Sequence, residues 1–395
     1  MASDAGSLRR LNKKMSSARG SLAQRVSIPV LAAALLLIAY GALVIWSASL
    51  TIPEASFPRH LLGIGIGLAL GAFMWRTDFR GLAGMSTLLL VLDLVVIFSP
   101  YIPGLSYSAK GMTGWIQIPG IGLTFQPVEL AKLITAFLIA GLGAQYNGHI
   151  DTVRDYAKLC LMLAIPFGAV VAAGDLGSGL VVFTGGVVII CMSGPKREWV
   201  LSTVAILIGL VSLILAADSL FDSLMGRDVL IKQYQMNRLL VFIDPSADTS
   251  GSGYNMQQSL IAVGSGGLFG KGIGHASQSG QGFLPEAQTD FVFALLSETF
   301  GFLGAMLLLA LFALLIFSSI RVAHRSDSLF LKLAGAGIIG MWTFQIFENI
   351  GMCIGLMPIT GIPLPFISFG SSSMIMQCAT VGIIQSIWRH RAKAA

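Results

Sequence analysis

Charged residues are scarce in this chain. They make up 11% of its 395 residues, whereas hydrophobic residues make up 55%, and the mean hydropathy is +0.80. This composition supplies too little polar surface for a soluble globule. A bilayer core of roughly 30 Å needs about 20 apolar residues per helix. The sequence therefore predicts an all-α polytopic membrane protein with about ten transmembrane helices in one integral domain.

Paired cysteines and internal repeats are also lacking. Each of the four cysteines lies singly inside an apolar run, at positions 160, 191, 353 and 378. Without CxxC spacing we expect small buried hydrophobes, no zinc site and no disulfide. No repeat period of 20 to 50 residues and no persuasive inverted repeat is visible, which disfavours a transporter.

The net charge of +6 does not point to nucleic acid. Most basic residues sit in short loops at the ends of apolar runs, where membrane topology explains them better. The predicted spans are 26–47, 59–75, 82–100, 127–145, 157–173, 178–193, 198–217, 291–320, 329–356 and 365–388. The first run is too long for a signal-peptide core and lacks an A-x-A-like exit, so we expect an uncleaved span.

The distribution of basic residues predicts the orientation of these spans. If residues 1–25, a basic arm, lie in the cytoplasm, then most basic loop residues and the tail 389–395 lie there as well. This asymmetry favours two cytoplasmic termini around an integral domain at 26–388. A large loop at 218–290, between spans 7 and 8, then faces outward. Within it we expect an interfacial amphipathic stretch at 218–228 and a short helix at 257–263.

Several ionisable residues fall inside the spans, where an unpaired charge is costly. Glu129 and Lys132 stand three apart after Pro127, a good first helical residue, so they share one helix face. They either form a structural ion pair, the favoured interpretation, or line a polar cavity that meets a substrate head group. Asp93 is either protonated or bonded to a neighbouring helix, and Glu348 has no local partner.

Carboxylates also mark the outer ends of helices. Asp290 ends the long loop where an apolar helix begins. It is either a helix cap or a general base at the membrane surface, where partial desolvation raises a carboxylate's pKa. Glu286 is the nearest alternative base, and Pro285 stiffens the approach. Asp175, between glycines, is expected to cap the sixth span, and its alternative role is to bind a cation or a substrate amide.

The glycine cluster GSGGLFGKG at 264–272 places backbone amides beside Lys271. Such a composition suits phosphate binding, although the Walker spacing and a preceding strand are missing. Outside the cell, a pyrophosphate-linked lipid is a more sensible anion than ATP. Arg238 is a second candidate ligand because a guanidinium binds phosphate in a fork. The alternative is that both residues are interfacial side chains that snorkel toward water.

These segments make the chain similar to a known family. The matching motifs are FQPVELAK, GDLGSGL, DPSADTSGSGYNMQQSLIAVGSGGLFGKG, FLPEAQTDFVFALLSE and NIGMCIGLMPITGIPLPFISFGSSS. They resemble the SEDS family (shape, elongation, division and sporulation), and the glycine-rich motifs resemble its RodA branch more than its FtsW branch. Two residues depart from the family's pattern: Gly114 stands where arginine is common, and Gln288 stands where histidine is common. Gln288 removes a titrating neighbour of Asp290.

The resemblance implies a peptidoglycan glycosyltransferase of the bacterial cytoplasmic membrane. Such an enzyme polymerises lipid II during cell elongation and shape maintenance, releases undecaprenyl pyrophosphate, and works with a class B penicillin-binding protein. By this analogy Asp290 is catalytic, and the other implied substrate-binding residues are Arg238, Lys271, Glu286, Glu129, Lys132 and Asp175. A divalent cation, Mg or Mn, is an alternative stabiliser of the pyrophosphate, with no ligands assigned. The rival functions are a lipid II flippase and a noncatalytic scaffold for the transpeptidase.

Overall fold

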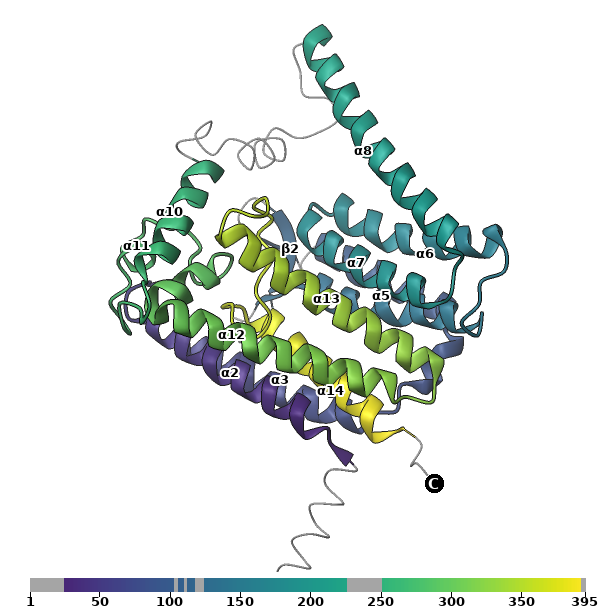
Figure 1. Ribbon diagram of the computed structural model, residues 1–395, viewed down its shortest axis with the longest axis horizontal. Helices are drawn as coiled ribbons and strands as arrows, with labels where there is room; N and C mark the ends of the chain where they lie inside the picture. Colours follow the sequence, from purple (N-terminus) through teal and green to yellow (C-terminus); the bar gives the residue numbers. More distant parts are fainter. Residues whose placement is uncertain (1–24, 103–105, 110–111, 118–123, 226–250, 392–395) are drawn as a thin grey trace, which may run out of the picture.

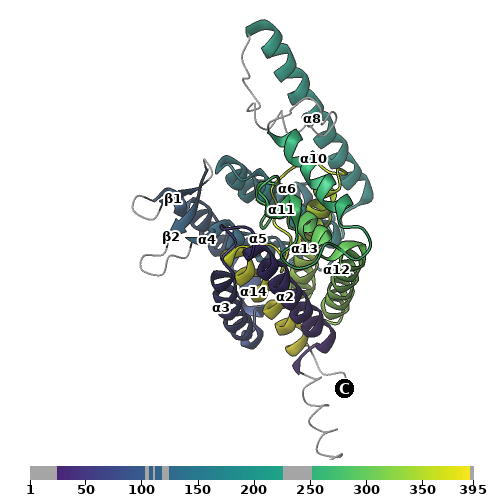
Figure 2. The ribbon, with the colours of Figure 1, turned by 90° about the vertical axis from the view of Figure 1, so that its left-hand side faces the viewer.

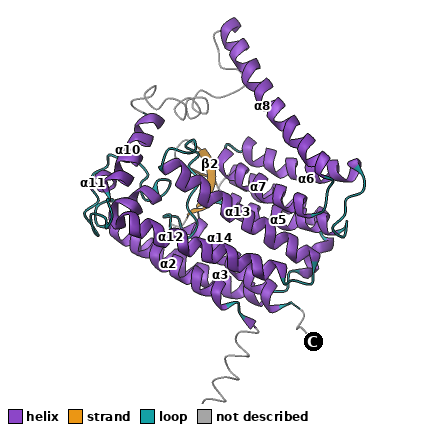
Figure 3. Cartoon of the chain, in the orientation of Figure 1, coloured by secondary structure: helices purple, strands orange, loops and turns teal. Residues whose placement is uncertain are grey.

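The protein is a bundle of long helices. The computed structural model describes residues 25–102, 106–109, 112–117, 124–225 and 251–391. Figures 1 and 3 show that most of the described chain is helical. The helices are α2 (Ile28–Ser49), α3 (Phe57–Arg76), η1 (Arg80–Gly84), α4 (Ser86–Phe98), η2 (Ser99–Tyr101), α5 (Pro127–Ala144), α6 (Val153–Ala172), α7 (Leu176–Met192), α8 (Arg197–Met225), α10 (Ser252–Ser265), α11 (Ser277–Gly280), α12 (Val292–His324), α13 (Leu329–Cys353) and α14 (Ser371–Arg389).

Each predicted apolar segment falls on one of these helices. Within the described ranges, seven helices are long and apolar enough to cross a membrane: α2, α3, α5, α6, α8, α12 and α13. Helices α4 and α7 are apolar but shorter, so the number of spans stays a prediction. Of the stretch expected at 218–228, residues 218–225 are helical and continuous with α8, and residues 226–228 lie outside the described residues. The helix expected at 257–263 exists as the longer α10.

A small antiparallel sheet interrupts the predicted all-helical pattern. Strands β1 (Ser106–Ala109), β2 (Met112–Gln117) and β3 (Thr124–Phe125) lie between α4 and α5 and pair in the order β1-β2-β3. Figure 2 shows β1 and β2 beside the helices. The expectation of an all-α chain was wrong in this detail. The segment is too short and too polar to appear in a search for apolar runs.

Helices α3 and α14 pack with almost no side chain between them. A Cβ atom at Gly71 would lie 2.6 Å from the carbonyl oxygen of Cys378, and one at Gly382 would lie 2.3 Å from the oxygen of Gly71. Only glycine permits this approach of two backbones, a common way for helices to associate in membranes. The contact extends to the start of α14, because a Cβ at Gly63 would lie 3.1 Å from the Cα of Ser371. It therefore fixes α14 against α3 along its length.

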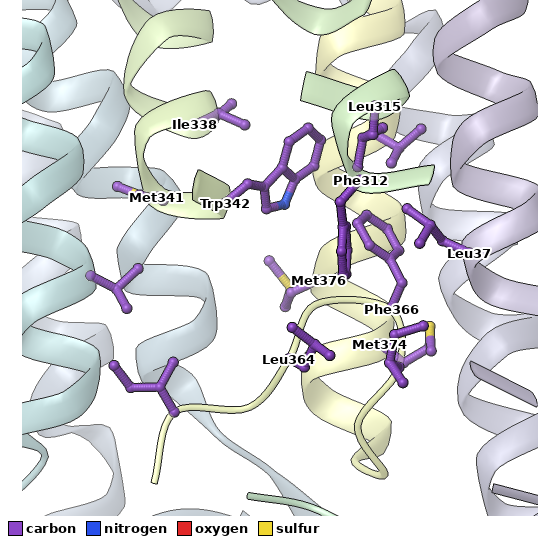
Figure 4. Packing of buried hydrophobic residues seen from close by; sticks show 14 of the residues in the cluster. Leu37, Phe312, Leu315, Ile338, Met341, Trp342, Leu364, Phe366, Met374 and Met376 are labelled. Atoms are coloured by element: carbon purple, nitrogen blue, oxygen red, sulfur yellow. The ribbon is translucent and has the colours of Figure 1, made fainter. Parts of the chain in front are cut away.

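The core supports the loop that connects α13 and α14. Trp342 of α13 is buried against Phe366 of this loop, with ring centroids 5.8 Å apart. Its indole nitrogen donates a hydrogen bond of 2.6 Å to Gln377 of α14. Figure 4 shows Leu364 and Phe366 pointing from the loop into the apolar cluster. The apolar core thus anchors one side of the loop. Its other contacts reach the turn before α12, where the amide of Phe369 donates to the carbonyl of Gln288 at 2.8 Å.

Helix α12 is bent near its beginning. Gly301 has φ 68 and ψ −165, outside the helical region. The glycine-rich loop crosses this bend: the amides of Lys271 and Gly272 donate to the carbonyls of Glu298 and Thr299 at 2.9 and 3.0 Å. The amide of Phe302 donates in return to Gly267 at 2.9 Å. The glycines therefore let the loop satisfy the backbone groups that the bend exposes.

Candidate functional site

Asp290 lies in a tight turn just before α12. The turn is closed by hydrogen bonds from the amides of Asp290 and Phe291 to the carbonyl of Glu286, at 3.0 and 3.2 Å. Glu286 adopts a positive φ of 56, and its carboxylate accepts a bond of 2.7 Å from Thr289. The N-cap of α12 is Phe291, without a side-chain cap bond. The N-cap position therefore belongs to Phe291 and not to Asp290, and the role of Asp290 as a general base stays a prediction.

The turn is bound tightly to the loop between α13 and α14. The Asn349 amide donates to the carbonyls of Asp290 and Ile362, at 2.7 and 2.8 Å. Ser368 donates its hydroxyl to the carbonyl of Thr289 at 2.6 Å. Because Asn349 and Ser368 both hold backbone atoms, they fix the path of the chain on either side of the Asp290 side chain.

The Asp290 carboxylate faces the backbone of Gly361. A Cβ atom at Gly361 would lie 3.3 Å from Oδ2 of Asp290, and this residue has φ +75. Thr360, its neighbour, donates its hydroxyl to Glu348 at 2.7 Å. Glu348 had no partner in the sequence, and the structure places it one residue from the Asp290 contact. The half-buried Asp290 side chain is thus held at one end of the bundle.

Asp175 reaches the opposite side of the same loop. Its Oδ1 accepts a bond of 2.8 Å from the amide of Ser178, so it is the N-cap of α7, as the sequence predicts. Its Oδ2 accepts from Gln126 at 3.0 Å. A Cβ at Gly177 would lie 3.3 Å from the carbonyl oxygen of Thr360. The start of α7 and the start of α12 therefore flank the short segment 360–362.

A small pocket opens beside Asp175. Its lining comes from α4, the sheet, α5 and the α6–α7 junction: Ile97, Pro100, Gly114, Trp115, Gln126, Val128, Ala173 and Asp175. A Cβ at Gly114 would meet nothing within 4 Å. The glycine at this position therefore leaves space beside Trp115 that a larger side chain would fill.

Glu129 and Lys132 form the ion pair that their spacing predicts. Nζ of Lys132 lies 2.6 Å from Oε1 of Glu129, and both side chains are buried in α5. Asp93 of α4 is bonded to a neighbouring helix, since its Oδ2 accepts a hydrogen bond of 2.6 Å from Thr135. The structure supports the ion-pair interpretation of Glu129 and Lys132. Their contact with a substrate stays a prediction.

Lys271 is bound to a buried carboxylate rather than left free. Its Nζ donates to Glu298 at 2.7 Å and to Ser277 at 2.6 Å. The amides of Gln278 and Ser279 donate to the two Glu298 oxygens at 2.8 and 3.0 Å. Glu298 has no exposed surface in its side chain, and Lys271 keeps 27% of its own. This carboxylate therefore clamps the start of α11 and Lys271 onto α12.

Three backbone amides of the glycine cluster are already hydrogen-bonded within the protein. The amides of Gly270, Lys271 and Gly272 donate to carbonyls of Gly266, Glu298 and Thr299. They are consequently unavailable to an anion. Arg238 lies outside the described residues. Across the described ranges, no three His, Cys, Asp or Glu side chains gather as a metal site.

Asn349, Thr360 and Glu298 are the residues that sequence reasoning left without a role or did not consider. All three lie within motifs that carry the family resemblance or next to Gly361. Their hydrogen bonds join segments far apart in the chain, for example Asn349 with Asp290. A signal was present in the motif NIGM, but nothing in its spacing indicated which backbone it would hold.

Comparisons with known proteins cover nearly the whole chain. The family model for FtsW, RodA and SpoVE, described as "Cell cycle protein", matches residues 28–393. Peptidoglycan glycosyltransferase MrdB of Escherichia coli (strain K12) is 33% identical over 90% of this chain and 92% of its own length. Stage V sporulation protein E of Bacillus subtilis (strain 168) is 34% identical over 90% of this chain and 95% of its own.

Solved structures agree with these matches. A chain of a peptidoglycan synthase complex that coordinates polymerization and crosslinking superposes with a TM-score of 0.71 at 28% identity, covering 91% of this chain and 96% of that one. The Rod shape determining protein RodA of Thermus thermophilus gives 0.65 at 26% identity, covering 92% and 97%. The fold, the motifs and the family match agree, and the chain belongs to the FtsW/RodA/SpoVE family.

Proposed function

We propose that this chain is a peptidoglycan glycosyltransferase that polymerises lipid II in the bacterial cytoplasmic membrane. Relatives named as peptidoglycan glycosyltransferases match over nine-tenths of its length. The observation that carries the proposal at the level of the site is Asp290, a half-buried carboxylate whose backbone is fixed by Asn349 and whose side chain faces Gly361. A fixed carboxylate at one end of a helical bundle suits a general base that acts where a lipid-linked sugar meets water.

The proposed reaction is an inverting transfer. Asp290 takes the proton from the free hydroxyl of the acceptor's N-acetylglucosamine while that oxygen attacks the anomeric carbon of the donor chain. The bond between this carbon and the pyrophosphate oxygen breaks, and undecaprenyl pyrophosphate leaves with the electron pair. The lipid tails lie between spans and the sugars at the outer surface. Glu286 remains the alternative base because it closes the same turn.

Stabilisation of the leaving pyrophosphate is assigned to basic residues. Lys271 uses two donors on Glu298 and Ser277, and an ammonium group has three, so one remains for a phosphate oxygen. Arg238 is the second proposed ligand. A divalent cation, Mg or Mn, would neutralise the same charge. Such an ion takes few protein carboxylates together with substrate phosphates.

Glu129, Lys132 and Asp175 keep proposed contacts with the substrate. Asp175 shares the segment 360–362 with Asp290, so we place the acceptor or donor sugars near it. The flippase alternative needs a polar path through the spans. Glu129, Lys132 and Glu348 are buried and already hydrogen-bonded, which does not favour such a path.

The partner and the cellular role follow from the same relatives. We propose that a class B penicillin-binding protein crosslinks the strands this chain makes, and that the pair serves elongation and cell shape. We also propose that both termini lie in the cytoplasm, because most basic loop residues then lie there as well. A noncatalytic scaffold for the transpeptidase is the remaining alternative, and an assay of the purified chain separates the two.

Asp290→Asn tests the proposal directly. In vesicles that contain lipid II, we expect the parent chain to form glycan polymer and the variant to form none. The two proteins should have the same elution volume in size-exclusion chromatography and the same melting temperature. Glu54→Gln, which removes an exposed carboxylate after α2, is the matched control and should retain activity. Glu286→Gln decides between the two candidate bases. Polymer formation by Asp290→Asn at the parental rate would contradict the assignment of Asp290 as the general base.

A further inference from the structure

Arginine side chains crowd the end of the bundle farthest from Asp290. Helix α12 has 33 residues, about 50 Å, with Asp290 just before its start and Arg325 just after its end. The ends of α3 and α14 lie near this second end. At and just after the ends of α3, α12 and α14, the arginines are Arg76, Arg80, Arg321, Arg325, Arg389 and Arg391, and the acidic residues are Asp78 and Asp327. This end therefore carries a strong local excess of positive charge.

Three of these arginines converge on the last turn of α14, and we call Arg80, Arg325 and Arg391 the arginine cluster. Arg391 stacks on Trp388 with its Cζ 3.2 Å from the ring centroid, and Arg325 approaches the same ring at 5.6 Å. Arg80 donates a guanidinium bond to the carbonyl of His390. Two cations on one aromatic ring repel each other, although the ring attracts each of them.

The charges in the arginine cluster are not neutralised by the protein that the structure describes. In that part of the chain, ion pairs join Lys132 with Glu129 and Lys271 with Glu298, and none reaches the cluster. Asp78 accepts a bond from the backbone amide of Arg80, not from its side chain. Burial lowers the pKa of Arg391, and the nearby charge of Arg325 lowers this pKa further.

Helix capping explains only part of the arrangement. Arg391 donates one bond to the carbonyl of Trp388, and Arg80 donates one to that of His390, as cations near a helix C-terminus do. A guanidinium has five N–H donors, so most donors of both groups remain. Arg325 makes no side-chain hydrogen bond within the described ranges. Its guanidinium therefore keeps its donors for an anion that lies between it and Arg391.

We propose that the arginine cluster binds the phosphate headgroup of an anionic phospholipid, with Trp388 as the floor of the site. The cluster lies at the ends of α3, α12 and α14, two of which are long and apolar enough to cross a membrane, so lipid headgroups are the anions at this level. Guanidinium forks match phosphate oxygens, and tryptophan suits the headgroup region. The proposal is independent of the glycosyltransferase activity.

The test measures binding of phosphatidylglycerol to the purified full-length chain by native mass spectrometry. The variant Arg80→Gln, Arg325→Gln, Arg391→Gln removes the arginine cluster. The matched control Arg154→Gln, Lys158→Gln, Arg197→Gln removes three exposed charges at the same end of the bundle. We expect the cluster variant to bind the first phosphatidylglycerol on the order of 100-fold more weakly, and the control to bind it as the parent does.

The single variant Arg325→Gln tests the proposal if the triple variant does not fold. The Arg325 side chain makes no hydrogen bond within the described ranges, so its replacement should not disturb the fold. In phosphatidylcholine we expect this variant to melt at a higher temperature than the parent, since the repulsion with Arg391 is gone. In phosphatidylglycerol the order should reverse. Absence of this reversal, equal loss of lipid in the control, or full displacement of the lipid by inorganic phosphate would each overturn the assignment.

Discussion

At the scale of single residues, the position of Asp290 depends on an amide elsewhere in the chain. Asn349 donates both of its N–H groups to backbone carbonyls, one of them that of Asp290. A side chain that holds the backbone of a proposed base acts by positioning, because it touches neither the acceptor hydroxyl nor the anomeric carbon. Small displacements of a reacting group are costly in rate, about 100-fold for 1 Å.

Asn349→Asp should therefore lower the turnover number and leave the KM for lipid II nearly unchanged. The carboxylate has the shape of the amide but no N–H to donate, and it faces two carbonyl oxygens. We expect kcat to fall on the order of 10- to 100-fold. Initial rates at several lipid II concentrations measure both constants. Asn147→Asp, the same chemical change at an exposed site, is the control, and parental kinetics in Asn349→Asp would contradict the role of Asn349.

The residues whose roles could be predicted are those whose partners lie within a few positions in the sequence. Asp175 stands between glycines at a helix start, and Glu129 stands three residues from Lys132, so a cap and an ion pair follow from spacing. Asn349 donates to the carbonyl of Asp290, 59 residues away, and Glu298 accepts from Lys271, 27 residues away. Such contacts arise only when helices meet, and no periodicity in the sequence encodes them.

At the scale of elements, the glycine contacts of α3 are not equivalent. Gly71 meets the backbone of Cys378, whereas a Cβ at Gly65 would have nothing within 4 Å. Gly71→Ala should therefore lower the free energy of unfolding by about 1–3 kcal/mol through overpacking. Gly65→Ala, in the same helix, should raise it by a few tenths to about 1 kcal/mol through helix propensity. Melting of both variants in one detergent is the comparison, and equal shifts would argue against backbone contact between α3 and α14.

The Glu298 clamp is a second element-scale feature. Glu298→Gln places an amide where the N–H groups of Ser279 and Lys271 now donate, so a buried network loses an acceptor. Breaking a buried pair from one side costs about 3–5 kcal/mol. Lys271→Met leaves a buried carboxylate and should also be destabilising. We expect the double variant to be less unstable than the sum of the two single variants, and the coupling free energy from a double-mutant cycle measures this.

Hydrogen exchange locates the effect of the clamp. In Glu298→Gln the amides of Gln278 and Ser279 should lose protection, while those of α13 keep theirs. Strict additivity in the cycle, together with unchanged exchange in α11, would mean that the ion pair does not hold this segment. The result also bears on the proposed function, because a Lys271 bound to Glu298 is already oriented for a pyrophosphate oxygen.

The helices themselves were predictable because an apolar run of about 20 residues is long enough to indicate a transmembrane helix. The loop between the last two helices was predicted too short. The predicted last span begins at residue 365, whereas α13 ends at Cys353 and α14 begins only at Ser371. The bend at Gly301 was also missed, because a lone glycine within an apolar helix gives no sign of the loop that pairs with it. Tertiary hydrogen bonds decide both features.

At the scale of the whole molecule, the two ends of the described chain lie on one side of the bundle. The amide of Ser27 donates to Gln385 at 2.8 Å, and Gln385 donates back at 2.9 Å, so the start of α2 and the end of α14 are joined. Figure 1 shows both at the same end. The turn that carries Asp290 lies at the other end, where the amide of Gly274 donates to Ser47 near the end of α2.

The basic residues lie near the termini, at the end of the bundle opposite Asp290. This arrangement predicts that two engineered cysteines, one at each end, differ in their accessibility to a reagent outside the cell. Cys160 and Cys191 are first replaced by alanine because they are not buried. In intact cells a membrane-impermeant maleimide should then label Glu54→Cys, on the side of Asp290, and should label Arg154→Cys only after permeabilisation. Positive charge retained in the cytoplasm is the physical reason. Labelling of Arg154→Cys alone in intact cells would invert the topology and place Asp290 away from the outer surface, where the proposed polymerisation could not occur.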